Sequence, residues 1–105
     1  MALKPETKSA MFVRAMRRLR EQYNSFEIAR WFAMGDEDKR GIRQISVAFN
    51  RKLYDQDHPD HRNPTNSDCL ATACLDFLDR LGYDLATLRY NEHGEIVELK
   101  KKSSD

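Results

Sequence analysis

The chain has 105 residues and a mass of 12.3 kDa, with 40% hydrophobic residues, 33% charged residues and a formal net charge of +1. A chain of this length builds one domain and buries about two-thirds of its surface on folding. Five Phe, four Tyr and one Trp exclude a disordered chain, which carries few aromatic side chains. We therefore expect a single small globular domain over residues 1–105, with a frayed basic tail over about residues 98–105.

Cysteine content and hydropathy indicate the compartment. Cys69 and Cys74 are too few for a disulfide-stapled secreted scaffold. The first residues lack the long apolar run of a secretory signal, and no window approaches the roughly 18 consecutive apolar residues that span a bilayer. The sequence therefore predicts a cytoplasmic protein that makes no membrane contact.

Charge is distributed unevenly along the chain. Residues 1–53 carry a net charge of +6, whereas residues 54–105 carry −5. A basic half can face nucleic acid or an acidic protein surface. An acidic half can close against the basic half or against a neighbouring subunit, so a homo-oligomer held by the basic and acidic halves is one option.

The basic half predicts three amphipathic helices. The first covers residues 6–23, the second covers residues 26–34 with Ser25 as its N-cap and Gly35 at its end, and the third opens at residues 36–38. The apolar stripes are Phe12, Ala15, Met16, Leu19 and Tyr23 in the first, Trp31 and Phe32 in the second, and Ile42, Ile45, Phe49 and Leu53 in the third.

An exposed loop and a fourth helix follow. Residues 55–66 contain Pro59 and Pro64 and cannot continue a helix. Asn66 or Ser67 is expected to cap the fourth helix, which Gly82 ends. Its apolar stripe is Leu70, Ala73, Cys74, Phe77 and Leu81.

Beyond residue 85 the hydrophobic period changes from helical to alternating, which predicts a β-hairpin around a turn at residues 91–94. The expected cross-strand pairs are Tyr90 with Glu95, Leu88 with Val97, and Ala86 with Leu99. A lone hairpin is marginal in water, so its apolar face must lie on the helices. The predicted fold class is α+β, about four helices packed against a C-terminal two-stranded antiparallel hairpin, with Trp31, Phe49 and Phe77 in the core.

The loop after the third helix carries the most distinctive motif. His58-Pro59-Asp60, between two amphipathic helices, resembles the signature of the J-domain, the co-chaperone module that stimulates Hsp70 ATPases. Residues 51–53 precede the His at the family's spacing, and Asn63-Pro64 follows it. The resemblance covers about residues 26–81. It implies that His58 and Asp60 are exposed at the loop tip, with the basic face of the third helix meeting an acidic Hsp70 surface.

Metal binding and catalysis are two other readings of this region. His58 and His61 with Cys69 and Cys74 supply zinc-ligand types, but two helical cysteines at this spacing stand about 140° apart around the helix axis. Ser67 or Cys69 near His58 suggests a nucleophile, yet the four glycines form no oxyanion or phosphate loop. We therefore predict no metal site, no cofactor and no enzymatic activity.

These observations favour a small non-enzymatic cytoplasmic regulatory protein that binds a protein partner through charged surfaces. A nucleic-acid-binding protein that uses Arg-rich helix faces and a J-domain-like co-chaperone stay open as alternatives. The predicted partner-binding residues are Arg14, Arg17 and Arg18 on the first helix and His58, Asp60, His61 and Arg62 in the loop.

Overall fold

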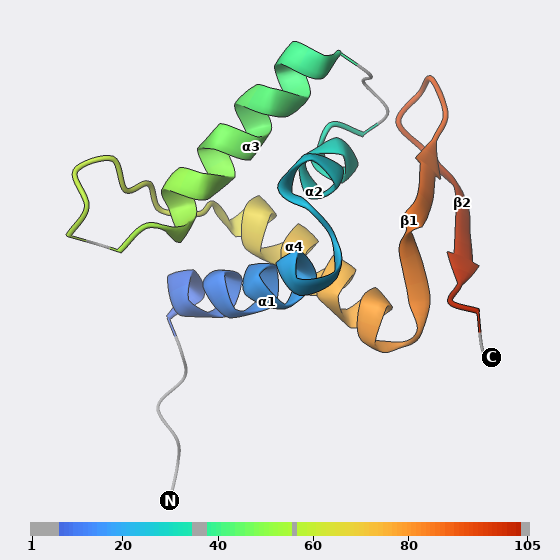
Figure 1. Ribbon diagram of the computed structural model, residues 1–105, viewed down its shortest axis with the longest axis horizontal. Coiled ribbons are helices and arrows are strands. Elements are labelled where there is room, and N and C mark those ends of the chain that lie inside the picture. The colour runs from blue at the N-terminus through green and yellow to red at the C-terminus, as the bar shows by residue number, and fades with distance from the viewer. Residues whose placement is uncertain (1–6, 35–37, 56, 104–105) are drawn as a thin grey trace, which may run out of the picture.

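The computed structural model describes residues 7–34, 38–55 and 57–103. Within these ranges four helices precede an antiparallel hairpin (Figure 1), which confirms the predicted α+β class and element order. The elements are α1 (Lys8–Gln22), α2 (Ser25–Phe32), α3 (Lys39–Leu53), α4 (Asn66–Arg80), β1 (Tyr83–Tyr90) and β2 (Ile96–Lys101). In the described part of the chain, no helix is long and apolar enough to cross a membrane.

Each helix begins at a side chain that accepts a hydrogen bond from the first turn. The N-caps of α1 to α4 are Thr7, Asn24, Asp38 and Thr65. The predicted caps Ser25 for α2 and Asn66 or Ser67 for α4 are therefore wrong. Thr65 has an acidic partner three residues later: its Oγ1 accepts from the Asp68 amide at 3.0 Å, and Asp68 Oδ2 accepts from the Thr65 amide at 2.8 Å. The expected helix boundaries at residues 6 and 35–37 lie outside the described residues.

Aromatic rings from α1, α2 and α3 form the centre of the core. Tyr23 meets Trp31 edge-on with ring centroids 4.9 Å apart, and Phe49 meets Phe32 in the same manner at 4.5 Å. The Phe12 ring also packs near Phe49, with ring centroids 6.2 Å apart. The apolar stripe of α1 is buried as predicted, and Trp31 and Phe49 are confirmed as core residues.

α4 packs with the opposite face from the one predicted. Its buried positions are Thr72, Asp76 and Asp79, and these face α1. The prediction of a core stripe on α4, with Phe77 in the core, is wrong: its members are Leu70, Ala73, Cys74, Phe77 and Leu81, and all are exposed. The carboxylates face inward because α1 presents hydrogen-bond donors at this contact. An apolar face of α4 would leave those donors without acceptors.

The hairpin forms in a different register from the predicted one. The observed partners are Tyr83 with Lys101, Asp84 with Lys100, Arg89 with Glu98, and Tyr90 with Ile96. The ladder is irregular because the Thr87 hydroxyl donates to the Asp84 carbonyl at 2.6 Å and accepts from the Lys100 amide at 2.8 Å. A side chain thus replaces a backbone group in the ladder.

This irregularity decides which residues of the hairpin are buried. Leu85 and Leu88, three residues apart, are fully buried, whereas Ala86 and Val97 of the predicted apolar face are exposed. Residues 98–101 belong to β2 and not to a frayed tail, and the Lys102 amide donates to the Gly82 carbonyl at 2.7 Å. Gly82 has a φ of 97°, a left-handed conformation, and ends the helical segment of α4, as the sequence predicted. β1 starts directly after it at Tyr83, earlier than the predicted strand.

Candidate protein-binding groove

α1 and the segment that follows α3 line a groove of about 600 Å³, here called the α1–loop groove. It brings together the two predicted sets of partner-binding residues, because Arg14, Arg17 and Arg18 of α1 share it with His61 of the loop. The other predicted loop residues, His58, Asp60 and Arg62, are exposed and do not line it.

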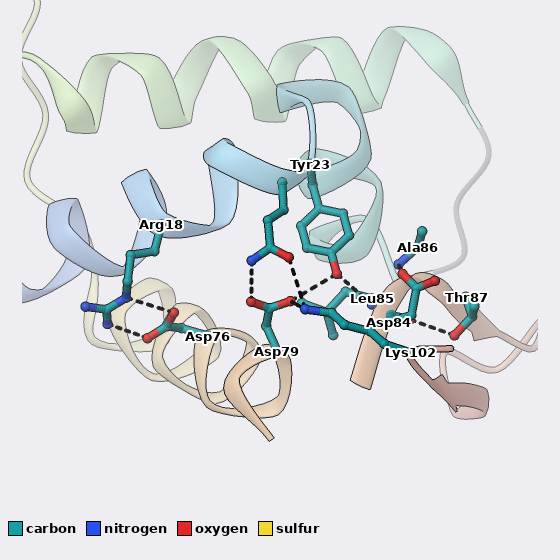
Figure 2. Close-up of polar contacts among 10 residues, drawn as sticks. Arg18, Tyr23, Asp76, Asp79, Asp84, Leu85, Ala86, Thr87 and Lys102 are labelled. Carbon is teal, nitrogen blue, oxygen red and sulfur yellow. Dashed lines mark hydrogen bonds and ion pairs between the residues drawn. The ribbon is translucent and has the colours of Figure 1, made fainter. Parts of the chain in front are cut away.

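Arg18 is committed to an ion pair inside the molecule. Its Nε and Nη2 donate to the two oxygens of Asp76 at 3.1 and 2.5 Å, and the Asp76 side chain is only 3% exposed. The hydrogen bond to Asp76 raises the pKa of the Arg18 guanidinium. Arg80 adds a second cation 3.4 Å from Asp76. Arg18 therefore holds α1 against α4 (Figure 2), which the prediction of a partner-binding role did not foresee.

The rest of the α1–loop groove carries both signs of charge. Arg14 and Arg17 lie on the exposed face of α1, and Glu21 lies one turn further along the same helix. Tyr54 and Asp55 contribute an aromatic ring and a second carboxylate from the end of α3.

Side-chain hydrogen bonds hold the loop in place. The Nδ1 of His61 lies 2.9 Å from the Tyr54 carbonyl and its Nε2 lies 3.0 Å from Asn63 Oδ1. His58 stacks on the Tyr54 ring with centroids 4.2 Å apart, and its Nδ1 accepts from the Asp60 amide at 3.0 Å. Both imidazoles therefore organise the loop beside the groove.

A second buried carboxylate joins the helices to the hairpin. Asp79 accepts hydrogen bonds from Gln22 at 2.6 Å, from the Tyr23 hydroxyl at 3.1 Å and from Lys102 at 2.8 Å (Figure 2). The Tyr23 hydroxyl also accepts from the Leu85 amide at 3.1 Å. Burial alone would raise the pKa of Asp79, but the hydrogen bonds from Lys102, Gln22 and Tyr23 outweigh burial and lower it. Burial raises the pKa of Tyr23 to about 12.

This network was not predicted from the sequence. A signal for it was present, because Thr72, Asp76 and Asp79 follow helical spacing on the side of α4 opposite its apolar stripe. Arg18, Gln22 and Tyr23 supply complementary donors from α1.

Metal-ligating side chains do not converge in the described structure, where no group of three or more His, Cys, Asp or Glu could hold an ion. Cys69 faces α1, with its Sγ 3.7 Å from the Lys8 carbonyl, whereas Cys74 is exposed. The two thiols thus point to different sides of α4.

The outer face of α3 forms a second charged surface, a groove of about 590 Å³. Its lining contains four cations and no carboxylate: Lys39, Arg40, Arg43 and Arg51, with Gln44, Val47 and Ala48 between them. It differs in this respect from the α1–loop groove.

Comparison with protein-family models, with curated proteins and with solved structures found no match. The resemblance of His58-Pro59-Asp60 to the J-domain signature is therefore not accompanied by a family match over the surrounding helices.

Proposed function

We propose that this chain is a small regulatory protein that binds a protein partner in the α1–loop groove and has no catalytic activity of its own. The observation that supports this most is the convergence of Arg17 and His61, which are far apart in the sequence, on one groove. Concave surfaces with a few convergent polar groups are common recognition sites.

The mixed charge of the groove favours a protein over a nucleic acid. Arg14 and Arg17 stand beside Glu21 and Asp55, so the complementary surface has both acidic and basic groups. A nucleic acid presents phosphates of one sign, which the two carboxylates would repel. Tyr54 adds a ring of the kind that is enriched at protein interfaces.

The engagement of His61 supports binding over proton transfer. Both of its ring nitrogens are already within hydrogen-bond distance of protein oxygens, the Tyr54 carbonyl and Asn63 Oδ1. A general base needs a ring nitrogen available to its substrate. We assign His61 the role of fixing the shape of the loop wall.

We propose the cytoplasm as the site of this function. Cys69 and Cys74 are free thiols, and Cys74 is exposed to solvent. Reducing compartments maintain that state of an exposed cysteine.

The test replaces one groove arginine. Arg17→Glu reverses a charge in the groove, and Arg20→Glu is the matched control because Arg20 is exposed on the same helix but does not line the groove. Immobilised wild type, Arg17→Glu and Arg20→Glu are compared by quantitative mass spectrometry of captured lysate proteins. We expect a partner that wild type and Arg20→Glu retain and that Arg17→Glu loses about tenfold or more. The same captured proteins on all three baits would contradict the proposal.

Nucleic-acid binding is a second candidate, supported by the outer face of α3. Its four cations, unaccompanied by carboxylates, suit a phosphate backbone. Fluorescence anisotropy with duplex and single-stranded DNA at about 50 mM salt tests it. Binding that weakens steeply with salt and is lost in Arg40→Glu/Arg43→Glu, but not in Arg17→Glu, would favour this candidate over the first.

A J-domain-like co-chaperone is a third candidate. Its support is the exposure of His58 and Asp60 in the loop between α3 and α4, together with the basic outer face of α3. An acidic chaperone surface would complement that face.

A further inference from the structure

The exposed side of α4 carries an apolar seam, defined as Leu70, Cys74, Phe77 and Leu81. Leu70 is 68% exposed, Phe77 55% and Leu81 51%. Successive members are four, three and four residues apart, which is the spacing of a helix–helix seam. Three large apolar side chains in one row on a folded domain indicate a surface that another molecule covers.

The seam is exposed because the opposite side of α4 is fixed. Asp76 and Asp79 are tied to α1 and to Lys102, so α4 cannot rotate its apolar side inward without stranding two carboxylates. The exposure is therefore a stable property of the fold.

An apolar groove of about 480 Å³ lies directly beside the seam. α4 contributes Ala71, Cys74, Leu75 and Leu78, and the opposite wall comes from α2 and the hairpin. Cys74 belongs to both the seam and the groove, so the two surfaces are continuous. The lining residues of the groove carry no charge.

Met34 closes this groove beside the hairpin turn. It has a φ of +53°, a conformation that favours glycine, and it is exposed. Its backbone and side chain lie close enough to Gly94 to contact an added Cβ there at 3.7–3.8 Å. A flexible methionine side chain held in this way can adapt to an incoming apolar surface.

We propose that a second copy of this chain occupies this face, in a two-fold dimer in which the α4 seams pair and each Phe77 enters the groove of the other copy. A protruding ring and an apolar groove side by side on one surface are what an isologous interface requires, since each copy offers the other both shapes. The proposal is independent of the α1–loop groove, which lies on other elements.

Charge and area agree with self-association. The seam has no charged member, so two copies meet there without like-charge contacts, and the net charge of +1 gives little long-range repulsion. At about 200 Å² for a fully exposed large apolar side chain, the exposed parts of Met34, Leu70, Phe77, Leu81 and Ile96 amount to roughly 600 Å² per copy. A dimer that covers these side chains completely buries about 1,200 Å² in total, the lower end of specific interfaces.

Sedimentation equilibrium of the full chain from about 1 to 500 µM tests the dimer. We expect the wild type to dimerise and Phe77→Asp to weaken association about 100-fold or more. Val47→Asp is the matched control because Val47 is a half-exposed apolar residue on α3, outside the seam and the apolar groove, and it should dimerise as the wild type does. Circular dichroism verifies that each variant is folded. A wild type that stays monomeric over the whole concentration range overturns the proposal and would indicate that a different protein covers this face. A dimer that Phe77→Asp does not weaken also overturns it.

Cysteine cross-linking gives a second readout. It uses the wild-type seam, with Cys74 itself as the cross-linking probe. Cys74 lies in the middle of the seam and comes close to its copy whether the two helices run parallel or antiparallel. We expect a short bismaleimide to link wild type and Cys69→Ser into covalent dimers and to fail with Cys74→Ser. Cys69 faces α1 and is the internal control. Equal cross-linking in Cys74→Ser, or none in Cys69→Ser, would contradict the pairing.

Discussion

Asp79 is a buried carboxylate that accepts hydrogen bonds from three donors in two parts of the chain, and each donor offsets part of the cost of taking its charge out of water. Gln22 and Tyr23 reach it from α1, and Lys102 reaches it from beyond β2. The result is one anchor that fixes α1, α4 and the hairpin together (Figure 2). Several hydrogen bonds to a buried carboxylate stabilise its ionised form.

The lowered pKa of Asp79 predicts how stability responds to acid. Its folded-state pKa lies below the ordinary value of 3.8, so the stabilisation is present above about pH 4 and is lost as pH falls toward the folded-state pKa. Urea unfolding from pH 7 to pH 3 measures this loss. Asp79→Asn should lower the free energy of unfolding at pH 7 by about 1–3 kcal/mol and flatten the acid slope.

Asp57→Asn, in the exposed loop, is the control for this experiment and should change the free energy of unfolding at pH 7 by less than about 0.5 kcal/mol. An Asp79→Asn variant with the stability and the acid slope of the wild type would show that the network contributes nothing to folding.

Thr72 is fully buried on the side of α4 that also carries Asp76 and Asp79. Its hydroxyl has no hydrogen-bond partner among the described residues. Thr72→Val keeps the shape and removes the stranded hydroxyl, so we expect a change between zero and about 1 kcal/mol in favour of the folded state. Thr72→Ser keeps the hydroxyl and loses a methyl group, and should destabilise by about 1 kcal/mol. Thermal unfolding measures both. A loss of more than about 1 kcal/mol in Thr72→Val would mean that the hydroxyl is satisfied.

At the scale of elements, α4 is amphipathic, as predicted, but it packs with the side that carries Thr72, Asp76 and Asp79, flanked by the half-buried Leu75 and Leu78, and leaves the predicted apolar stripe exposed. Truncating a core side chain to Ala should therefore lower the free energy of unfolding more than truncating a side chain of the seam. Trp31→Ala and Phe49→Ala are expected to lower the free energy of unfolding by about 3–5 kcal/mol, whereas Phe77→Ala should lower it by less than about 1 kcal/mol because the ring is already half in water. Chemical denaturation at low micromolar concentration avoids any contribution from self-association. A loss above 3 kcal/mol in Phe77→Ala would contradict the observed orientation of α4.

The loop between α3 and α4 offers a test of the co-chaperone candidate. His58 stacks on Tyr54 at the surface and is expected to be replaceable, so His58→Gln should change stability by less than about 0.5 kcal/mol. The purified wild type is expected to leave the ATP turnover of an Hsp70 unchanged. A clear stimulation that His58→Gln abolishes would replace the proposed function with the co-chaperone candidate, because no purely structural role of His58 predicts it.

At the scale of the whole molecule, the opposite charges of the two halves are partly used within the chain. Arg18 and Lys52 of the basic half pair with Asp76 and Asp68 of the acidic half, the latter at 2.5 Å. Burial alone would raise the pKa of Asp68, but the hydrogen bonds from Lys52 and Thr65 lower it overall. The basic side chains of the α3 outer face stay exposed. Figure 1 shows α3 at the edge of the molecule.

Local sequence by itself determined the elements of this protein. Helical spacing, capping residues and the glycine at position 82 set four helices and a hairpin, and the aromatic stripes of α1 to α3 set the core around Trp31 and Phe49. These features are local, because they depend on residues within a few positions of one another.

Only the tertiary structure decided which face of α4 is covered and how the strands pair. Periodicity shows that α4 has an apolar side, but Arg18 and Gln22, which donate to Asp76 and Asp79, come from α1, more than fifty residues away in the chain. The ladder depends likewise on one hydroxyl, Thr87, which joins the two strands. The convergence of Arg17 with His61 follows from the same long-range packing. The α1–loop groove and the exposed face of α4 therefore arise from contacts that no local pattern encodes, because a side chain's partner depends on the fold and not on its neighbours in sequence.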